Sequence, residues 1–270
     1  LLPPVDTGES IGLDASKLTI TFGVSKTFLK KVGLKSKIPH SFKDLPHFPN
    51  DQLDKAITGG DIFIQACAND PQVAFHAIHN LIRPYLDLVQ IKWSETGFIS
   101  GKGNETPRNL MAFKDGTQNP RDIEGYKDYV FLDDGWATYG TYCVLRKIQI
   151  HIETWDRTAL EEQEATFGRH RASGAPLGKK DEYDTLDLSA KDASGEYVIP
   201  TDAHARLARE AKTEILRRAY NYMRGTDDAT GNYDTGLLFI SFQKSPQQFI
   251  DIQNSLGSKD KLNEYITHRG

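Results

Sequence analysis

Apolar and polar residues alternate in several short segments of the first hundred positions, as in strands that bury one face. Between residues 18 and 22 the apolar residues are separated by threonines, and a second apolar segment ends at Cys67. Asp70 followed by Pro71 is a typical helix start, and apolar residues recur behind it at helical spacing. The pattern predicts strands at 18–22, 60–67 and 88–98 and a helix at 71–82.

The second half of the chain repeats this order of elements. Alternation predicts strands at 148–152, 215–222 and 236–242, and helical spacing predicts helices at 155–167 and after Ser245-Pro246. The segment GLLFISFQKSPQQFIDI echoes GDIFIQACANDPQVAFH in both pattern and turn residues. A repeated strand-and-helix unit indicates an α+β protein built from two ferredoxin-like halves.

Turn-forming residues divide the two halves. Gly101, Gly103, Asn104 and Pro107 lie close together, so we expect an N-terminal domain at 1–101 and a C-terminal domain at 102–270. A polar stretch at 169–201 has little periodicity and predicts a long loop. Long loops inside compact domains are often functional.

Charge and composition exclude two classes of partner. The formal net charge is -4, and no concentrated basic face of the kind that binds phosphate backbones is visible, so we expect no nucleic-acid partner. No stretch approaches the roughly 18 apolar residues of a membrane-spanning helix, so we expect no membrane span.

Several short motifs together carry the chemical interpretation. The segment Phe113–Pro120 (FKDGTQNP) is a compact acidic turn, and taken alone its Asp-Gly pair would predict only a turn. Other motifs follow at Trp155-Asp156-Arg157, Phe167-Gly168-Arg169, GAPLG at 174–178, DAHARLA at 202–208 and ILRR at 215–218. In order and spacing this set resembles the dye-decolourising (DyP-type) haem peroxidases, and in particular their EfeB-like branch.

The resemblance implies the tandem ferredoxin-like fold, with haem b held by the C-terminal half. It implies that His204 is the axial ligand of the haem iron, and we choose Asp234, just before a predicted strand, as the residue that orients this histidine. It implies that Asp115 is the acid/base for hydrogen peroxide and that Arg217 supplies a positive charge there. Because neighbours on a strand face opposite sides, Arg218 would face away from the haem.

The same resemblance assigns a lining to the haem. The residues expected there are Gly116, Thr117, Gln118, Arg206, Arg209, Glu210, Ala211 and Arg217, with Arg206 suited to the propionates. Ala112 stands where the family's GXXDG motif has its first glycine, which restricts the backbone. The segment between His204 and Arg217 is shorter than in some relatives. The family's first strand and helix and its last strand, after Tyr265, have no counterpart in the sequence, so we expect a chain trimmed at both ends.

Two functions share this set of residues, and a third differs from both. The leading hypothesis is a peroxidase that reduces hydrogen peroxide and oxidises an unidentified reductant; the alternative is a deferrochelatase that releases iron from haem and leaves the porphyrin intact. A haem carrier without turnover is the third, although a carrier needs neither Asp115 nor Arg217. The resemblance also implies a homo-oligomer (a dimer), a link to an iron-uptake system, and export by the twin-arginine route to the periplasm or cell surface, through a signal that this chain does not contain.

Overall fold

The computed structural model describes residues 10–101, 105–133, 135–228 and 230–270. Strands and helices are mixed along the chain, as expected for an α+β fold. The strands are β1 (Thr19–Val24), β2 (Ile62–Cys67), β3 (Tyr142–Ile150), β4 (Leu216–Arg217), β5 (Tyr220–Thr226), β6 (Tyr233–Gln243) and β7 (Ile266–His268). The helices are α1 (Lys26–Lys31), α2 (Pro71–Ile82), α3 (Ile123–Tyr129), α4 (Ile152–Trp155), α5 (Leu160–Phe167), α6 (His204–Glu210) and α7 (Pro246–Leu256). Within the described ranges, no helix combines the length and apolar character needed to cross a membrane.

Packing divides the chain into two compact units. The first contains Leu1–Pro39 and Gly59–Ser94, and the second contains His40–Thr58 and Glu95–Gly270. The expected domain boundary between residues 101 and 102 stays a prediction, because packing alone does not define which segment folds independently.

The first unit forms around an antiparallel pair of strands. β1 and β2 pair from Thr19 opposite Cys67 to Val24 opposite Ile62. The side chain of Asp70 accepts a hydrogen bond from Gln72 N at 2.7 Å and begins α2, with Pro71 in the first turn. The strands and the helix predicted for residues 18–22, 60–67 and 71–82 are confirmed.

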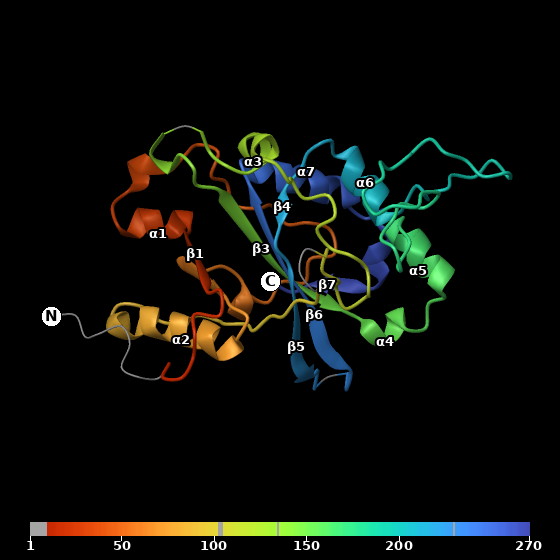
Figure 1. Ribbon diagram of the computed structural model, residues 1–270. Helices are drawn as coiled ribbons and strands as arrows, with labels where there is room; N and C mark the ends of the chain where they lie inside the picture. Colours follow the sequence, from red (N-terminus) through yellow and green to blue (C-terminus); the bar gives the residue numbers. More distant parts are fainter. Residues whose placement is uncertain (1–9, 102–104, 134, 229) are drawn as a thin grey trace. The chain divides into compact units, whose positions relative to one another are not determined.

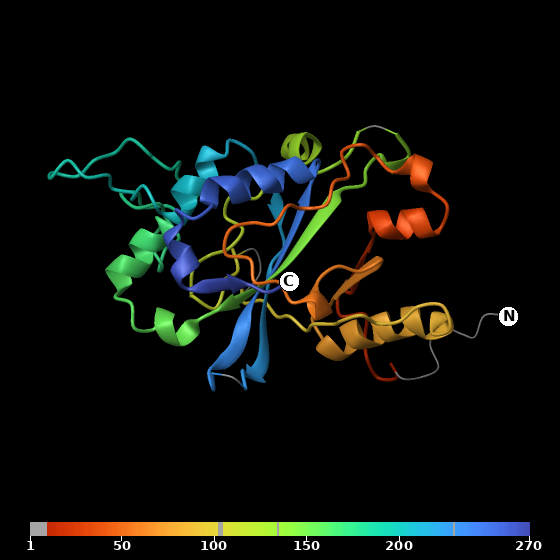
Figure 2. The same cartoon turned by 180° about the vertical axis from the view of Figure 1, so that it is seen from behind.

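The second unit is built on an antiparallel sheet of five strands. The strand order is β4-β6-β3-β7, and β5 also pairs with β6. A capping box at Ser245 and Gln248 begins α7, which packs against β3 and β6, and α6 packs against α7. Figure 1 and Figure 2 show α6 beside α7, with the loop after α5 extending past them. This loop matches the one predicted at 169–201.

Three expectations about elements were wrong. Residues 88–98 form no ladder, and only Phe98 makes a β-bridge there, to Asn221. The helix expected at 155–167 is two helices, α4 and α5, separated by a turn at 156–159. A strand does follow Tyr265: β7 pairs with β3, with His268 opposite Ile148. Alternation of apolar and polar residues indicates a segment that can form a strand. A β-ladder also needs a second strand whose backbone N–H and C=O groups are available for pairing.

Candidate active site

A tight turn presents Asp115 to the sheet of the second unit. Asn109 Oδ1 accepts hydrogen bonds from Met111 N and Phe113 N, each at 3.1 Å, and Asp115 N donates to Pro107 O at 2.8 Å. Ala112 adopts φ +69°, in the left-handed region that favours glycine. The turn therefore keeps the conformation expected of the motif although its first glycine is replaced.

Asp115 meets Arg217, which lies at the end of β4. Arg217 Nη1 is 3.1 Å from Asp115 Oδ1, with side chains 26% and 13% exposed. Asn119 ties the two segments together, because its Oδ1 accepts from Arg217 N at 2.9 Å and its Nδ2 donates to Arg217 O at 2.8 Å. Both residues expected to act on peroxide are thus side by side, at a site that water can still reach.

A second guanidinium, that of Arg169, lies near Arg217. Arg169 Nη1 donates to Gly174 O at 2.7 Å and to Glu182 O at 3.1 Å, whereas its buried Nη2 has no partner among the described residues. Burial, and then repulsion from Arg217, lower the pKa of Arg169 to about 10, although Glu182 opposes this. Arg169 is therefore still a cation at neutral pH, with one donor available to an anion.

His204 begins α6 and is oriented by a buried carboxylate. Its Nδ1 lies 2.7 Å from Asp260 Oδ2, and the Asp260 side chain is 3% exposed. Asp260 is itself held, because its Oδ1 accepts from Leu262 N at 2.9 Å. In the neutral imidazole, an Nδ1 that donates to this carboxylate leaves Nε2 with a lone pair for a ligand.

The choice of Asp234 as the partner of His204 was wrong. Asp234 lies on β6 and lines a separate polar cavity of about 310 Å³ with Lys147 and Arg224. The carboxylate that contacts His204 belongs instead to Asp260, which is 56 residues beyond His204 in the sequence.

An aromatic cluster connects the histidine to the turn of Asp115. The rings of Phe167 and His204 have centroids 6.2 Å apart, and Phe167 stacks on Phe113 at 4.0 Å. Trp155 packs edge-on against both phenylalanines. Phe113 is two residues before Asp115, so one buried cluster sets the positions of both His204 and the acidic turn.

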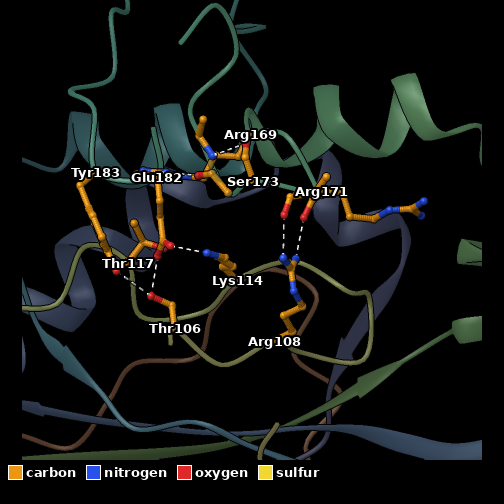
Figure 3. A network of polar contacts seen from close by, with 12 residues as sticks. Thr106, Arg108, Lys114, Thr117, Arg169, Arg171, Ser173, Glu182 and Tyr183 are labelled. Atoms are coloured by element: carbon orange, nitrogen blue, oxygen red, sulfur yellow. Dashed lines mark hydrogen bonds and ion pairs between the residues drawn. The ribbon is translucent and has the colours of Figure 1, made fainter. Parts of the chain in front are cut away.

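Glu182, from the loop after α5, clamps the acidic turn (Figure 3). Its carboxylate accepts from Thr106 Oγ1 at 2.5 Å and Thr117 Oγ1 at 3.0 Å, and it forms an ion pair with Lys114. Burial by itself would raise the pKa of Glu182, but the hydrogen bonds from Lys114, Thr106 and Thr117 outweigh it and lower that pKa. Gly174 leaves room for this contact, because a Cβ there would lie 2.6 Å from Lys114 Cδ.

Arg108 forms a second clamp between the same two loops. Its Nη1 donates to Ala112 O at 2.7 Å and to Arg171 O at 2.6 Å, and its Nη2 donates to Ala172 O at 2.7 Å. The three carbonyls converge on one guanidinium, as Figure 3 shows for Arg171. The two clamps hold the acidic turn against the loop after α5.

Several expected lining residues have other partners. Arg206 is buried and its Nε and Nη2 donate to the carbonyls of Ile199, Pro200 and Leu188; the propionate role expected for it stays a prediction. Arg209 pairs with Glu214 at 3.4 Å and is half exposed. For the other expected lining residues, contact with haem stays a prediction. Thr117 is buried and Gly116 has a positive φ of +105°. Gln118 and Glu210 are exposed, and Ala211 lies at the end of α6.

Sequence reasoning gave no role to Asp260, Glu182 or Asn119. A signal existed for Glu182, which lies in the loop marked as functional by its length, and for Asn119, which belongs to the FKDGTQNP segment. Asp260 precedes a short 3-10 turn, and its sequence context indicates only a cap.

The residues present fit an iron porphyrin. His204 offers one imidazole nitrogen with its ring held by a buried carboxylate, which is the usual arrangement of an iron-binding histidine. The unpartnered buried Nη2 of Arg169, near Arg217, suits an anionic substituent such as a propionate. Asp115 and Arg217 form a separate polar pair, suited to a small polar reactant.

Known proteins agree with this assignment. Residues 1–99 match the family described as Dyp-type peroxidase, N-terminal, and residues 106–270 match Dyp-type peroxidase, C-terminal. The deferrochelatase of Yersinia pseudotuberculosis serotype I (strain IP32953) is 39% identical over 285 residues, which cover 98% of this chain and 65% of that protein. The deferrochelatase of Escherichia coli (strain K12) is 40% identical over 286 residues, which cover 98% of this chain and 66% of that protein. The chain thus spans slightly less than two thirds of these curated relatives.

Solved structures extend the likeness to the fold. Ferric DtpA from Streptomyces lividans has a TM-score of 0.92 at 34% identity, covering 98% of this chain and 75% of that one. The DyP-type peroxidase of Cellulomonas bogoriensis has a TM-score of 0.88 at 36% identity, covering 94% of this chain and 73% of that one. The expected α+β fold of tandem ferredoxin-like halves and the expected family are confirmed, and with the family its haem cofactor. The chain belongs to the Dyp-type peroxidase family.

Proposed function

We propose that this chain is a haem-dependent peroxidase that reduces hydrogen peroxide at Asp115 and Arg217. The proposal rests on two pairs of side chains: His204 with buried Asp260, and Asp115 with Arg217. The same aromatic cluster contacts His204 and includes Phe113, two residues before Asp115. A protein that only stores haem needs the first pair but not the second.

The residues divide the work between them. Haem, when bound, would supply the redox chemistry that reduces peroxide, with electrons replaced by an external reductant. His204 Nε2 would hold the iron, and Asp260 would orient the ring through Nδ1 and increase the basicity of Nε2. Asp115 accepts a proton from one peroxide oxygen and returns it to the other, which leaves as water. Arg217 keeps a positive charge beside the anion formed on the way.

Asp115→Asn tests this division of roles. Asparagine keeps the size and the turn preference of aspartate but is no base, so haem should still bind. The reaction with peroxide should slow by roughly 10²- to 10⁴-fold, the usual worth of general acid/base catalysis. The measurement is the rate of the Soret change after rapid mixing with hydrogen peroxide.

Asp122→Asn is the matched control, because Asp122 is an exposed N-cap of α3 and asparagine caps equally well. Its rate should equal that of the unmodified protein. A near-normal rate for Asp115→Asn would make Asp115 a structural turn residue and leave Arg217 as the main group.

A second candidate function is release of iron from haem with the porphyrin left intact. It is favoured by the name of the relatives with 39% and 40% identity, which are deferrochelatases. The same residues would hold haem for either activity. Incubation with haem followed by measurement of free porphyrin fluorescence separates the two, because a peroxidase alone leaves no metal-free porphyrin.

Partners and location follow from the same family likeness. We propose a reductant that is still to be identified, assembly as a dimer, a link to iron uptake, and export by the twin-arginine route. The name of the deferrochelatase relatives supports the link to iron. Sedimentation of the purified chain tests the dimer, and cell fractionation tests export to the periplasm or cell surface.

A further inference from the structure

A small cavity lies beside Asp115. The space open to the centre of a water molecule is about 10 Å³, enough for one water. Its walls include Asp115, Arg108, Asn109, Ala219, Asn221 and Leu237.

Asn221 is held in this wall by strand geometry. On β5 it pairs with Leu237 of β6, and its backbone N donates to Phe98 O at 2.8 Å. Arg217, Ala219 and Asn221 keep one register against β6, so alternation turns all three to the same face. Asn221 therefore faces the side of the sheet on which Arg217 meets Asp115.

The amide of Asn221 is only half satisfied. Its side chain is buried, with the residue 4% exposed, and its Nδ2 donates to Arg108 O at 3.1 Å. Its Oδ1 is buried and accepts no hydrogen bond from any residue in the described part of the chain. A buried acceptor without a donor is unfavourable, so the wall of the cavity offers a site for a donor.

Asp115 presents a second acceptor to the same cavity. Its Oδ1 is buried and receives no hydrogen bond from the described residues, because Arg217 Nη1, although 3.1 Å away, is not aligned to donate. Two residues that line this water-sized cavity thus each carry a buried oxygen without a donor. A water molecule has two O–H donors, one for each oxygen.

We propose that this cavity is a binding site for one ordered water that donates to Asp115 Oδ1 and Asn221 Oδ1, and that Asn221 is a positioning residue for Asp115. The evidence for the water site is the cavity and the two buried acceptors. The role of this water in catalysis rests on the proposed function. By donating to Asp115 Oδ1, the water would hold the carboxylate in one orientation beside Arg217.

The charged side chains around Asp115 do not supply this hydrogen bond to Oδ1. Arg217 is its ion-pair partner. Arg108 lines the cavity, but its guanidinium donates to the carbonyls of Ala112, Arg171 and Ala172. Lys114, next in the chain, pairs with Glu182. The water is the donor that suits Oδ1 without drawing on any of these contacts.

The decisive variant is Asn221→Leu, which keeps a similar volume but removes the acceptor that holds the water. Loss of the hydrogen bond from the water should shift the antisymmetric carboxylate stretch of Asp115 and slow the reaction with peroxide by roughly 10-fold, as expected when a charged group loses one hydrogen bond. The stretch is read from the infrared spectrum of the purified full chain and identified by its loss in Asp115→Asn. The substitution also removes the Nδ2 donor to Arg108 O, so the fold of the variant is checked by circular dichroism.

Tyr222→Phe is the matched control. Tyr222 is the next residue along β5, it faces the opposite side, and its buried hydroxyl has no partner among the described residues. Its substitution should leave the Asp115 carboxylate stretch unchanged.

A crystal structure of the unmodified protein provides a test that does not depend on any variant folding. Density for a water within hydrogen-bond distance of both oxygens supports the proposal, and its absence from well-ordered density overturns it. An Asp115 carboxylate stretch that stays the same in folded Asn221→Leu overturns it as well. Because the infrared band does not depend on turnover, a protein inactive toward peroxide would contradict the proposed function and leave the water site standing.

Discussion

At the scale of single residues, the acidic turn contains a local strain that the sequence makes visible. Ala112 replaces the first glycine of the family motif, and the structure holds it at φ +69°. A residue with a Cβ loses roughly 1–2 kcal/mol in this region. The surrounding hydrogen bonds of Asn109 and Arg108 maintain the turn in spite of this loss.

Ala112→Gly should therefore stabilise the protein. The expected gain in the free energy of unfolding is about 0.5–1 kcal/mol, because relief of strain is offset in part by the greater freedom of glycine in the unfolded chain. Chemical denaturation measures it. Ala211→Gly, at φ -65° at the end of α6, should show the opposite sign, and a loss at both positions would argue against strain at Ala112.

His204 shows what sequence reasoning can and cannot find at this scale. Its motif and the resemblance to the family were enough to single it out, because both lie within a few neighbouring positions. Its carboxylate partner is brought close only by the fold, from the turn before β7. The sequence does not distinguish Asp234 from Asp260, because the neighbours of neither residue indicate a contact with His204.

Asp260→Asn should weaken haem retention by about 10- to 100-fold, the usual effect of removing the partner of a metal-binding histidine. Asparagine can still cap the turn at Leu262, so the fold should survive. The rate of haem transfer to an excess of apomyoglobin measures the effect. Asp234→Asn is the control, and equal losses in the two variants would remove the special role of Asp260.

At the scale of elements, local sequence patterns predicted the helices and strands that pack against other regular helices and strands. β1, β2, α2 and α7 appear where alternation or a cap placed them. The strand expected at 215–222 is nearly continuous, since β4 and β5 share one register against β6 with a break only at Arg218 and Ala219. The strand predicted at 88–98 does not form because these residues have no partner strand. A local sequence pattern does not show whether such a partner exists.

The clamp of Glu182 on the acidic turn joins two elements that are far apart in the sequence. Glu182→Gln keeps the shape but removes the charge that Lys114, Thr106 and Thr117 satisfy. The free energy of unfolding at pH 7 should fall by about 1.5–3 kcal/mol, the range for a hydrogen bond to a charged group. Urea denaturation measures the difference, and Glu196→Gln, an exposed glutamate of the same loop, should change little.

The same clamp predicts a pH dependence. The pKa of Glu182 is lower in the folded protein than the ordinary 4.5, so the unfolded chain binds the proton more readily. The stability that Glu182 contributes is fully present above pH 4.5 and is lost as the pH falls through the lower folded value. The difference between the unmodified protein and Glu182→Gln should therefore shrink in acid; a constant difference would mean that the clamp acts through packing alone.

At the scale of the whole molecule, every residue proposed to meet haem or peroxide belongs to the second unit. Asp115, Arg217, His204 and Asp260 come from four separate segments, and the aromatic cluster of Phe113, Trp155 and Phe167 packs between them. A ligand that contacts several of these segments stabilises the folded form of this unit over the unfolded one.

Haem should therefore raise the melting temperature of the second unit. At a haem concentration of about 100 times its dissociation constant the gain is about 2.7 kcal/mol, or roughly 5–10 °C for a unit of this size. His204→Ala should lose most of this shift. His170→Ala is the matched control, because His170 also pairs with a carboxylate, Glu164 at 2.8 Å, but lies on the loop after α5 with its side chain 40% exposed. If both variants kept the full shift, haem would be held without His204 and the axial assignment would be wrong; if both lost it equally, the effect would reflect damage to the fold. Loss in His204→Ala alone is the outcome that the structure leads us to expect, because His204, unlike His170, combines a carboxylate partner that is 3% exposed with contact to Phe167 of the aromatic cluster.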